Sequence, residues 1–112
     1  MSRKGKRIEK IIANRYRKAG YNVKENAIKK FNQYRKMEID IVARKGNEKL
    51  IIEVKGGKQT ITSSDILKLH KKSNKTRGKP VLAITENVKL TNNAKRLAKY
   101  LGIKIKRIKL RK

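Results

Sequence analysis

The chain has 112 residues, of which 34 are Lys or Arg and only eight are Asp or Glu, giving a formal net charge of +26. This excess predicts a polyanionic partner, because phosphate neutralisation with counterion release supplies most non-specific nucleic-acid affinity. No apolar run approaches the roughly 20 residues that span a bilayer, so no membrane partner is expected. The absence of Cys excludes disulfides, thiolate metal ligands and Cys nucleophiles. We expect one domain, residues 1–112, in an intracellular, nucleoid-associated (cytoplasmic) protein.

The first half of the chain predicts one helix followed by strands. Apolar residues at helical spacing indicate a helix over residues 6–19. A short strand is expected at 21–27, and residues 28–36 form a polar, basic linker. Two further strand-like runs, 37–44 and 49–56, flank a Gly-Asn pair that is typical of a hairpin turn.

The second half alternates helices with strands. Thr62 begins a helix, with Asp65 in the position of a capping box. Pro80–Thr85 predicts a buried strand, Thr91 caps a third helix, and Ile103–Lys106 predicts a last strand. The predicted order is α-β-β-β-α-β-α-β. Because the later strands alternate with helices, we expect an α/β fold with a mixed central sheet flanked by helices.

The register of the predicted hairpin places two acids opposite each other. With a loop at Gly46-Asn47, counting back along both strands brings Asp40 opposite Glu53 and Glu38 opposite Lys55. A loop that is one residue longer or shorter than this register requires would shift the pairing. Alternation along each strand puts the apolar residues on the opposite face from these charges: Met37, Ile39 and Ile41 on one strand, and Leu50, Ile52 and Val54 on the other.

Two carboxylates held across a hairpin favour a metal site. Facing Cβ atoms lie about 5 Å apart, and like charges at that distance repel unless a cation lies between them. Mg²⁺ is the expected cation, with Mn²⁺ as an alternative, because it binds through one or two carboxylates and keeps several waters. Lys55 adds a fixed positive charge that could hold the attacking water or stabilise the transition state. The alternative is a set of cross-strand ion pairs, which contribute little to stability.

The hairpin motif resembles the signature of the PD-(D/E)xK nuclease superfamily. Ile39-Asp40 followed by Glu53-Val54-Lys55 is the core of that resemblance, although Ile39 stands where the superfamily name has Pro. The longer stretches 37–43 and 50–55 are similar to those of archaeal Holliday junction resolvases and related restriction-type nucleases. The resemblance implies the restriction-endonuclease-like fold and a Mg²⁺-dependent endodeoxyribonuclease with Asp40 and Glu53 as metal ligands.

The resemblance also implies one further site residue and a homodimer, and the residues themselves offer other candidates. A Glu in the first helix reaches the metal site in such resolvases, so Glu9 is a candidate ligand, although it could equally interact with the helix dipole. Glu38 and Gln59 are additional candidates. Basic residues near the N-terminus and in the linker are expected to bind DNA phosphates: Arg3, Lys4, Lys6, Arg7, Lys29, Lys30, Arg35 and Lys36. A homodimer is implied by the family alone.

The predicted function is therefore structure-specific cleavage of DNA, branched DNA in particular. The chain is too short to carry a separate module for reading sequence, which favours recognition of DNA shape. Two alternatives remain: a restriction-like or repair nuclease that acts on linear or single-stranded DNA, and a binding protein that keeps the fold without cutting.

Overall fold

A five-stranded mixed sheet forms the centre of the protein. The computed structural model describes residues 3–32 and 35–110. The sheet has the strand order β1-β2-β3-β5-β7, with antiparallel pairing from β1 to β3 and parallel pairing from β3 to β7. Its strands are β1 (Asn22–Asn32), β2 (Arg35–Lys45), β3 (Glu48–Lys55), β5 (Lys79–Thr85) and β7 (Lys104–Ile108).

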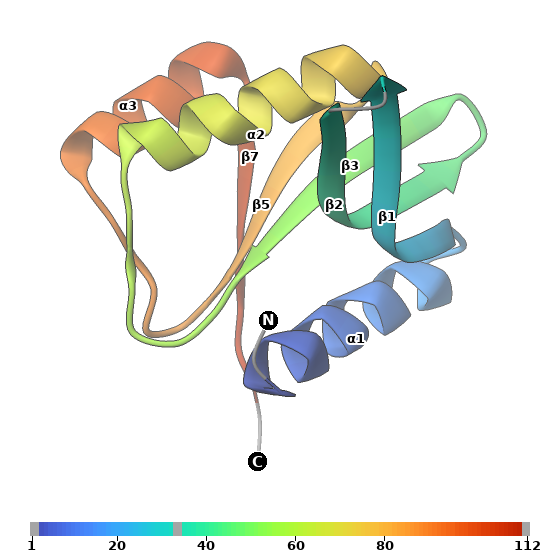
Figure 1. The fold of residues 1–112 in the computed structure, drawn as a ribbon. Coiled ribbons are helices and arrows are strands. Elements are labelled where there is room, and N and C mark those ends of the chain that lie inside the picture. Colours follow the sequence, from blue (N-terminus) through green and yellow to red (C-terminus); the bar gives the residue numbers. More distant parts are fainter. Residues whose placement is uncertain (1–2, 33–34, 111–112) are drawn as a thin grey trace.

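Helices cover both faces of this sheet. Helix α1 (Arg3–Lys18) lies on one face, and α2 (Ser63–Thr76) and α3 (Asn92–Leu101) lie together on the other (Figure 1). Two short strands that the sequence did not predict, β4 (Thr60–Ile61) and β6 (Lys89–Leu90), pair in parallel as a small second sheet. The predicted α/β class, the mixed sheet and the order of the main elements are confirmed.

The core is divided between the two faces of the sheet. Under α2 and α3 lies one buried cluster, which includes Ile39, Val42, Ile51, Ile66, Leu69, Leu82 and Ile84. Under α1 lies the other, which includes Ile8, Ile12, Tyr16, Ile41, Leu50, Ile52 and Val54. No helix among the described residues has both the length and the apolar character of a membrane span.

The helix ends follow local sequence signals. The backbone N–H of Thr62 donates to Asp65 Oδ2 at 2.9 Å, so Asp65 satisfies a donor at the start of α2. Thr91 Oγ1 accepts from the backbone N–H of Ala94 at 3.0 Å at the start of α3. Gly102, with φ 73°, ends that helix in the left-handed conformation.

The predicted linker at 28–36 is wrong. Residues 28–32 continue β1 and residues 35–36 begin β2, so the two strands form a long hairpin. Pairing with the neighbouring strand satisfies the backbone hydrogen-bonding groups, so a polar, basic stretch can be a strand at the edge of a sheet without an alternating apolar pattern.

Both ladders of β2 are interrupted at Asp40. Towards β1, pairing runs from Asn22 to Glu25 and resumes at Ala27, so the position of Asn26 opposite Asp40 is skipped. Asn26 has a φ of 53°, in the left-handed region. Towards β3, the predicted register is confirmed from Lys45 opposite Glu48, but the ladder ends at Ile41 opposite Ile52.

This interruption corrects two details of the predicted hairpin. The ladder does not reach the predicted pairs Asp40–Glu53 and Glu38–Lys55. Met37 and Ile39 also pack in the cluster under α2 and α3, whereas Ile41 lies under α1. The strand therefore rotates at Asp40, and its residues do not keep one face along its whole length.

Candidate active site

Asp40 bonds to the neighbouring strand through its side chain where the backbone ladder stops. Its Oδ2 accepts a hydrogen bond from the backbone N–H of Val54 at 2.9 Å. Val54 lies between Glu53 and Lys55 in the chain, so this bond holds the Asp40 carboxylate against the backbone that carries both of them. The side chain thus takes over a β3 donor that would otherwise need a ladder partner.

Glu53 lies between two lysines. Its side chain is only 16% exposed. Its Oε2 lies 3.8 Å from the ammonium nitrogen of Lys55 on the same strand. Its Oε1 accepts a hydrogen bond at 3.3 Å from the ammonium group of Lys72 on α2. Both oxygens of this carboxylate therefore face a positive charge.

The surroundings of Glu53 act on its charge in opposite directions. Burial raises the pKa of the Glu53 carboxyl most, and the nearby Asp40 carboxylate raises it further. Lys72 and Lys55 lower the pKa, but the net pKa remains above the ordinary value. Asp40 and Glu53 are thus close enough to repel each other, which is the arrangement that a bound cation relieves.

Lys72 is a site residue that the sequence interpretation missed. It lies three residues after the buried Leu69 and next to the buried Ser73, so it flanks the face of α2 that packs on the sheet. A helical projection from Ile66 and Leu69 would have placed Lys72 near the face of the helix that packs on the sheet. That Glu53 lies opposite it follows only from the packing of α2 on the sheet.

The other two predicted acids, Glu9 and Glu38, differ in burial. Glu9 is buried, with 1% exposure, on α1. Its neighbour Ile8 packs so closely on the end of β3 that a Cβ at Gly56 would collide with it, so this turn of α1 lies beside the end of the strand that carries Lys55. Glu38 is exposed on β2.

Gln59 lies on the exposed loop after β3. Its side-chain amide donates to the backbone carbonyl of Gly56 at 2.6 Å. This bond folds the loop back towards the end of β3.

The donor set fits a divalent cation held by two carboxylates. Within residues 3–32 and 35–110, no group of three or more His, Asp or Glu side chains is placed to hold a metal ion, so Glu9 and Glu38 do not form such a group with Asp40 and Glu53. Two carboxylates with water completing the shell suit Mg²⁺ or Mn²⁺. Asp40 and Glu53 are the residues that could hold it.

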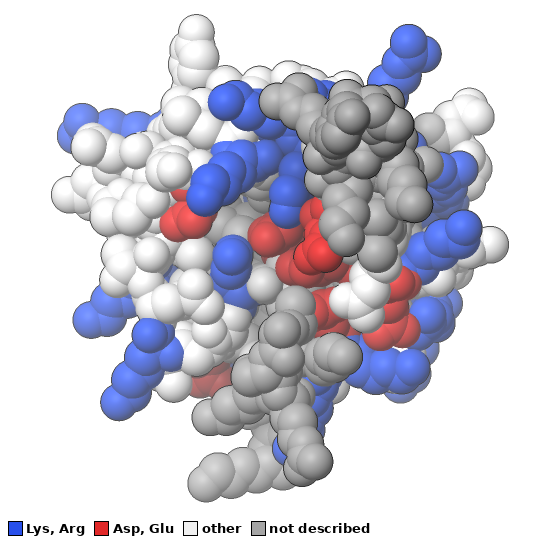
Figure 2. Space-filling view, viewed as in Figure 1, with Lys and Arg blue, Asp and Glu red and all other residues white. Residues whose placement is uncertain are grey.

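Acidic side chains gather on one face of the protein, with basic side chains around them (Figure 2). Figure 2 shows acidic groups gathered near the middle of that face, with Lys and Arg around them. Of the residues predicted to bind DNA phosphates, Arg7 is exposed on α1. The side chains of the others lie outside the described part of the chain: Arg3, Lys4, Lys6, Lys29, Lys30, Arg35 and Lys36.

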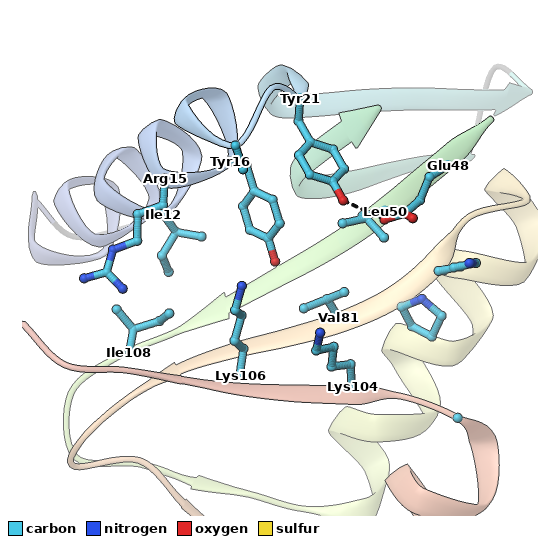
Figure 3. Close-up of a pocket in the computed structure, with 14 residues that line it drawn as sticks. Ile12, Arg15, Tyr16, Tyr21, Glu48, Leu50, Val81, Lys104, Lys106 and Ile108 are labelled. Carbon is cyan, nitrogen blue, oxygen red and sulfur yellow. Dashed lines mark hydrogen bonds between the residues drawn. The ribbon is translucent and has the colours of Figure 1, made fainter. Parts of the chain in front are cut away.

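An apolar groove of about 710 Å³ lies on the α1 side of the sheet, between α1 and β7 (Figure 3). Tyr16, Leu50 and Lys106 are among the residues that line it. Tyr21 donates its hydroxyl hydrogen to Glu48 at 2.7 Å at one end of the groove. None of the candidate metal ligands lines this groove, so it is separate from the site around Glu53.

Fold and site together define a restriction-endonuclease-like domain, with acids and a lysine on a central hairpin of a mixed sheet. Residues 1–111 match the family model described as restriction endonuclease (Mrr_cat). The chain belongs to this restriction endonuclease family. Membership confirms the predicted PD-(D/E)xK superfamily and the coarser prediction of a nuclease domain.

Two solved structures share the fold. The crystal structure of a protein of unknown function, AF1548, has a TM-score of 0.70 and 24% identity, covering 88% of this chain and 55% of that one. The structure of EndoMS in its apo form has a TM-score of 0.61 and 14% identity, covering 94% of this chain and 47% of that one. The chain thus spans about half the length of each. No curated protein matches it.

Proposed function

We propose that the chain is a metal-dependent DNA endonuclease that hydrolyses phosphodiester bonds. Its proposed active site is formed by Asp40, Glu53 and Lys55. The observation that carries this proposal is the largely buried carboxylate of Glu53, held near Asp40 and between two lysines in a chain with a net charge of +26. Burying one acid next to another is unfavourable for folding, so a binding role gives the arrangement a reason to exist. Membership of the restriction endonuclease family supports it.

Each residue has a separate task in the proposed reaction. Asp40 and Glu53 would hold Mg²⁺, and the hydrogen bond from Val54 fixes the orientation of Asp40. When bound there, a divalent ion would polarise the phosphoryl group and would make water a better nucleophile. Lys55, whose ammonium group already lies 3.8 Å from Glu53, would hold the attacking water or stabilise the charge that develops on the phosphate. Glu9 would join them as a further ligand from α1 only after its side chain moves towards the metal, because in the structure it forms no metal-binding group with Asp40 and Glu53.

The proposed substrate is branched DNA, bound by a homodimer. The resemblance of residues 37–43 and 50–55 to resolvases supports this choice, and a twofold dimer would place two sites on a symmetric junction. The basic residues of the N-terminus and of the β1–β2 hairpin would neutralise backbone phosphates. Membership of the restriction endonuclease family favours a second candidate, cleavage of linear duplex.

Cleavage assays with matched variants test the site and the substrate. Labelled four-way junctions, linear duplex and single strands are incubated with Mg²⁺, with Mn²⁺ or with a chelator. Asp40→Asn and Glu53→Gln remove a charge from the site. Glu48→Gln is the control, because it neutralises an acid of the same strand that instead accepts a hydrogen bond from Tyr21.

We expect metal-dependent cutting of junctions that both site variants lose and the control retains. Binding of DNA without cleavage under every metal condition would refute the enzymatic proposal. Equal cutting of junctions and linear duplex would refute preference for branched DNA and support the second candidate. Wild-type rates in both site variants would refute the assignment of Asp40 and Glu53.

A further inference from the structure

Lys72 and Lys55 contact different oxygens of one carboxylate. Lys55 comes from the same strand as Glu53, and its ammonium group lies 3.8 Å from Oε2. Lys72 comes from α2 and donates to Oε1 at 3.3 Å, so it is the nearer of the two cations. Glu53 thus has two cationic partners, and the role of the second one, Lys72, needs an explanation.

The charges of the groups around Glu53 supply this explanation. In the structure, the negative charges of Asp40 and Glu53 meet the positive charges of Lys55 and Lys72, and the four groups balance. A divalent cation on the two carboxylates would leave the group with an excess positive charge. Such an excess suits an incoming phosphate, which is anionic and gains charge density on its oxygens during hydrolysis.

The position of Lys72 allows it to serve two partners. Its side chain is 26% exposed, so its ammonium group is not enclosed by the core. The four-carbon stem extends from a helix that is fixed to the sheet by Ile66 and Leu69, so the ammonium group can move while its backbone stays in place. An ammonium group on a flexible side chain at the edge of a site can leave one anionic partner and bind another.

We propose that Lys72 is a second lysine of the active site: its ammonium group takes the place of the divalent cation on Glu53 in the metal-free protein, and contacts the DNA phosphate once Glu53 has bound the metal. This proposal rests on the nuclease function proposed above and deepens it. A purely structural ion pair would only stabilise α2 against β3. A placeholder, in contrast, competes with the metal for Glu53.

Metal affinity distinguishes these two roles without any measurement of cleavage. The Lys72 ammonium nitrogen lies 3.3 Å from Glu53 Oε1, where a bound divalent ion would also lie. Removing the Lys72 charge should therefore tighten divalent-ion binding by about fivefold or more, because the repulsion between two unit charges about 4 Å apart has this size even in bulk water. Lys72→Gln and Lys72→Met remove the charge, and Lys72→Arg keeps it. Lys71→Gln is the matched control, because Lys71 is the exposed neighbour on the same helix.

Calorimetric titration with Mn²⁺ in the absence of DNA measures this affinity. Asp40→Asn, which should lose binding, verifies that the titration reports this site. We expect tighter binding in Lys72→Gln and Lys72→Met, with Lys72→Arg and Lys71→Gln within about twofold of the wild type. Unchanged or weaker binding in both neutral variants would overturn the placeholder role.

Single-turnover cleavage at saturating Mn²⁺ tests the second half of the proposal. The neutral Lys72 variants should cut about tenfold or more slowly, although their sites are filled, because a positive charge that stabilises the transition state is missing. Cleavage at the wild-type rate would overturn the contact with phosphate. If the wild type itself cuts no DNA, the nuclease proposal fails, and the Mn²⁺ titrations still decide whether Lys72 competes for Glu53.

Discussion

The two roles of Asp40 can be separated by comparing two substitutions. Asp40→Ala removes both the negative charge and the acceptor of the Val54 N–H hydrogen bond, which is 2.9 Å long. Asp40→Asn removes the charge but keeps a side-chain carbonyl oxygen that can accept the same bond. Both variants lose a proposed metal ligand, so both should lose cleavage. Only the alanine variant should lose stability.

The size of the stability difference follows from the hydrogen bond. Val54 is buried, with 8% exposure, so its N–H has little access to water once the Asp40 acceptor is gone. An unsatisfied buried donor costs about 1–3 kcal/mol. Removing Asp40 also relieves its repulsion with Glu53, but this gain is the same in both variants and cancels between them. Asp40→Ala should therefore be less stable than Asp40→Asn by about 1–3 kcal/mol.

Urea and thermal unfolding in the presence of a chelator measure this difference. For a domain of this size it corresponds to a difference of about 4 °C or more in the unfolding midpoint. Glu38→Ala, an exposed acid on the same strand, serves as the control and should stay within about 0.5 kcal/mol of the wild type. Coincident unfolding curves for the two Asp40 variants would show that the hydrogen bond to Val54 does not stabilise the hairpin.

Three further predictions concern Glu53, Asn26 and Lys55. The folded-state pKa of Glu53 is raised, mainly by burial, so its contribution to stability is present below the unfolded pKa and is lost as pH rises through the folded pKa. In chelator at neutral pH, Glu53→Gln should therefore be the more stable protein, and urea midpoints that follow the wild type at every pH would contradict this. Asn26, with φ 53°, should tolerate Gly within about 0.5 kcal/mol but lose about 1 kcal/mol on substitution by Ala in thermal unfolding; equal midpoints would argue against backbone strain there. Lys55→Met should slow single-turnover cleavage by about 100-fold, because a cation that stabilises the transition state is missing. DNA binding should change little, because the rest of the large positive charge remains. A wild-type cleavage rate would exclude Lys55 from the reaction.

Local chemistry made much of the fold predictable. The Thr91 cap and the Gly102 terminator of α3 each act within one turn of the helix that they delimit. The turn at Gly46 fixes the register of β2 against β3 from Lys45 opposite Glu48 to Ile41 opposite Ile52, which is why this part of the hairpin could be predicted. Such features depend on neighbours in the chain, so they can be inferred without knowing how the elements pack.

The errors in the prediction arose where non-local pairing overrides local character. Residues 28–32 are polar and basic, yet they are a strand because β2 supplies their backbone partners. The rotation of β2 at Asp40 depends on two interrupted ladders, one on each side of the strand, and on the left-handed backbone of Asn26. Periodicity within one strand carries no information about either neighbour.

By itself, then, the sequence determined the family signature, the hairpin and the three residues proposed for the reaction, because each follows from residue type and spacing along the chain. Only the tertiary structure decided that the Asp40 side chain bonds to the Val54 N–H and that Lys72 reaches Glu53 from α2. These contacts depend on where a strand leaves its ladder and on how a helix packs across a sheet, and neither is written into any single stretch of the chain.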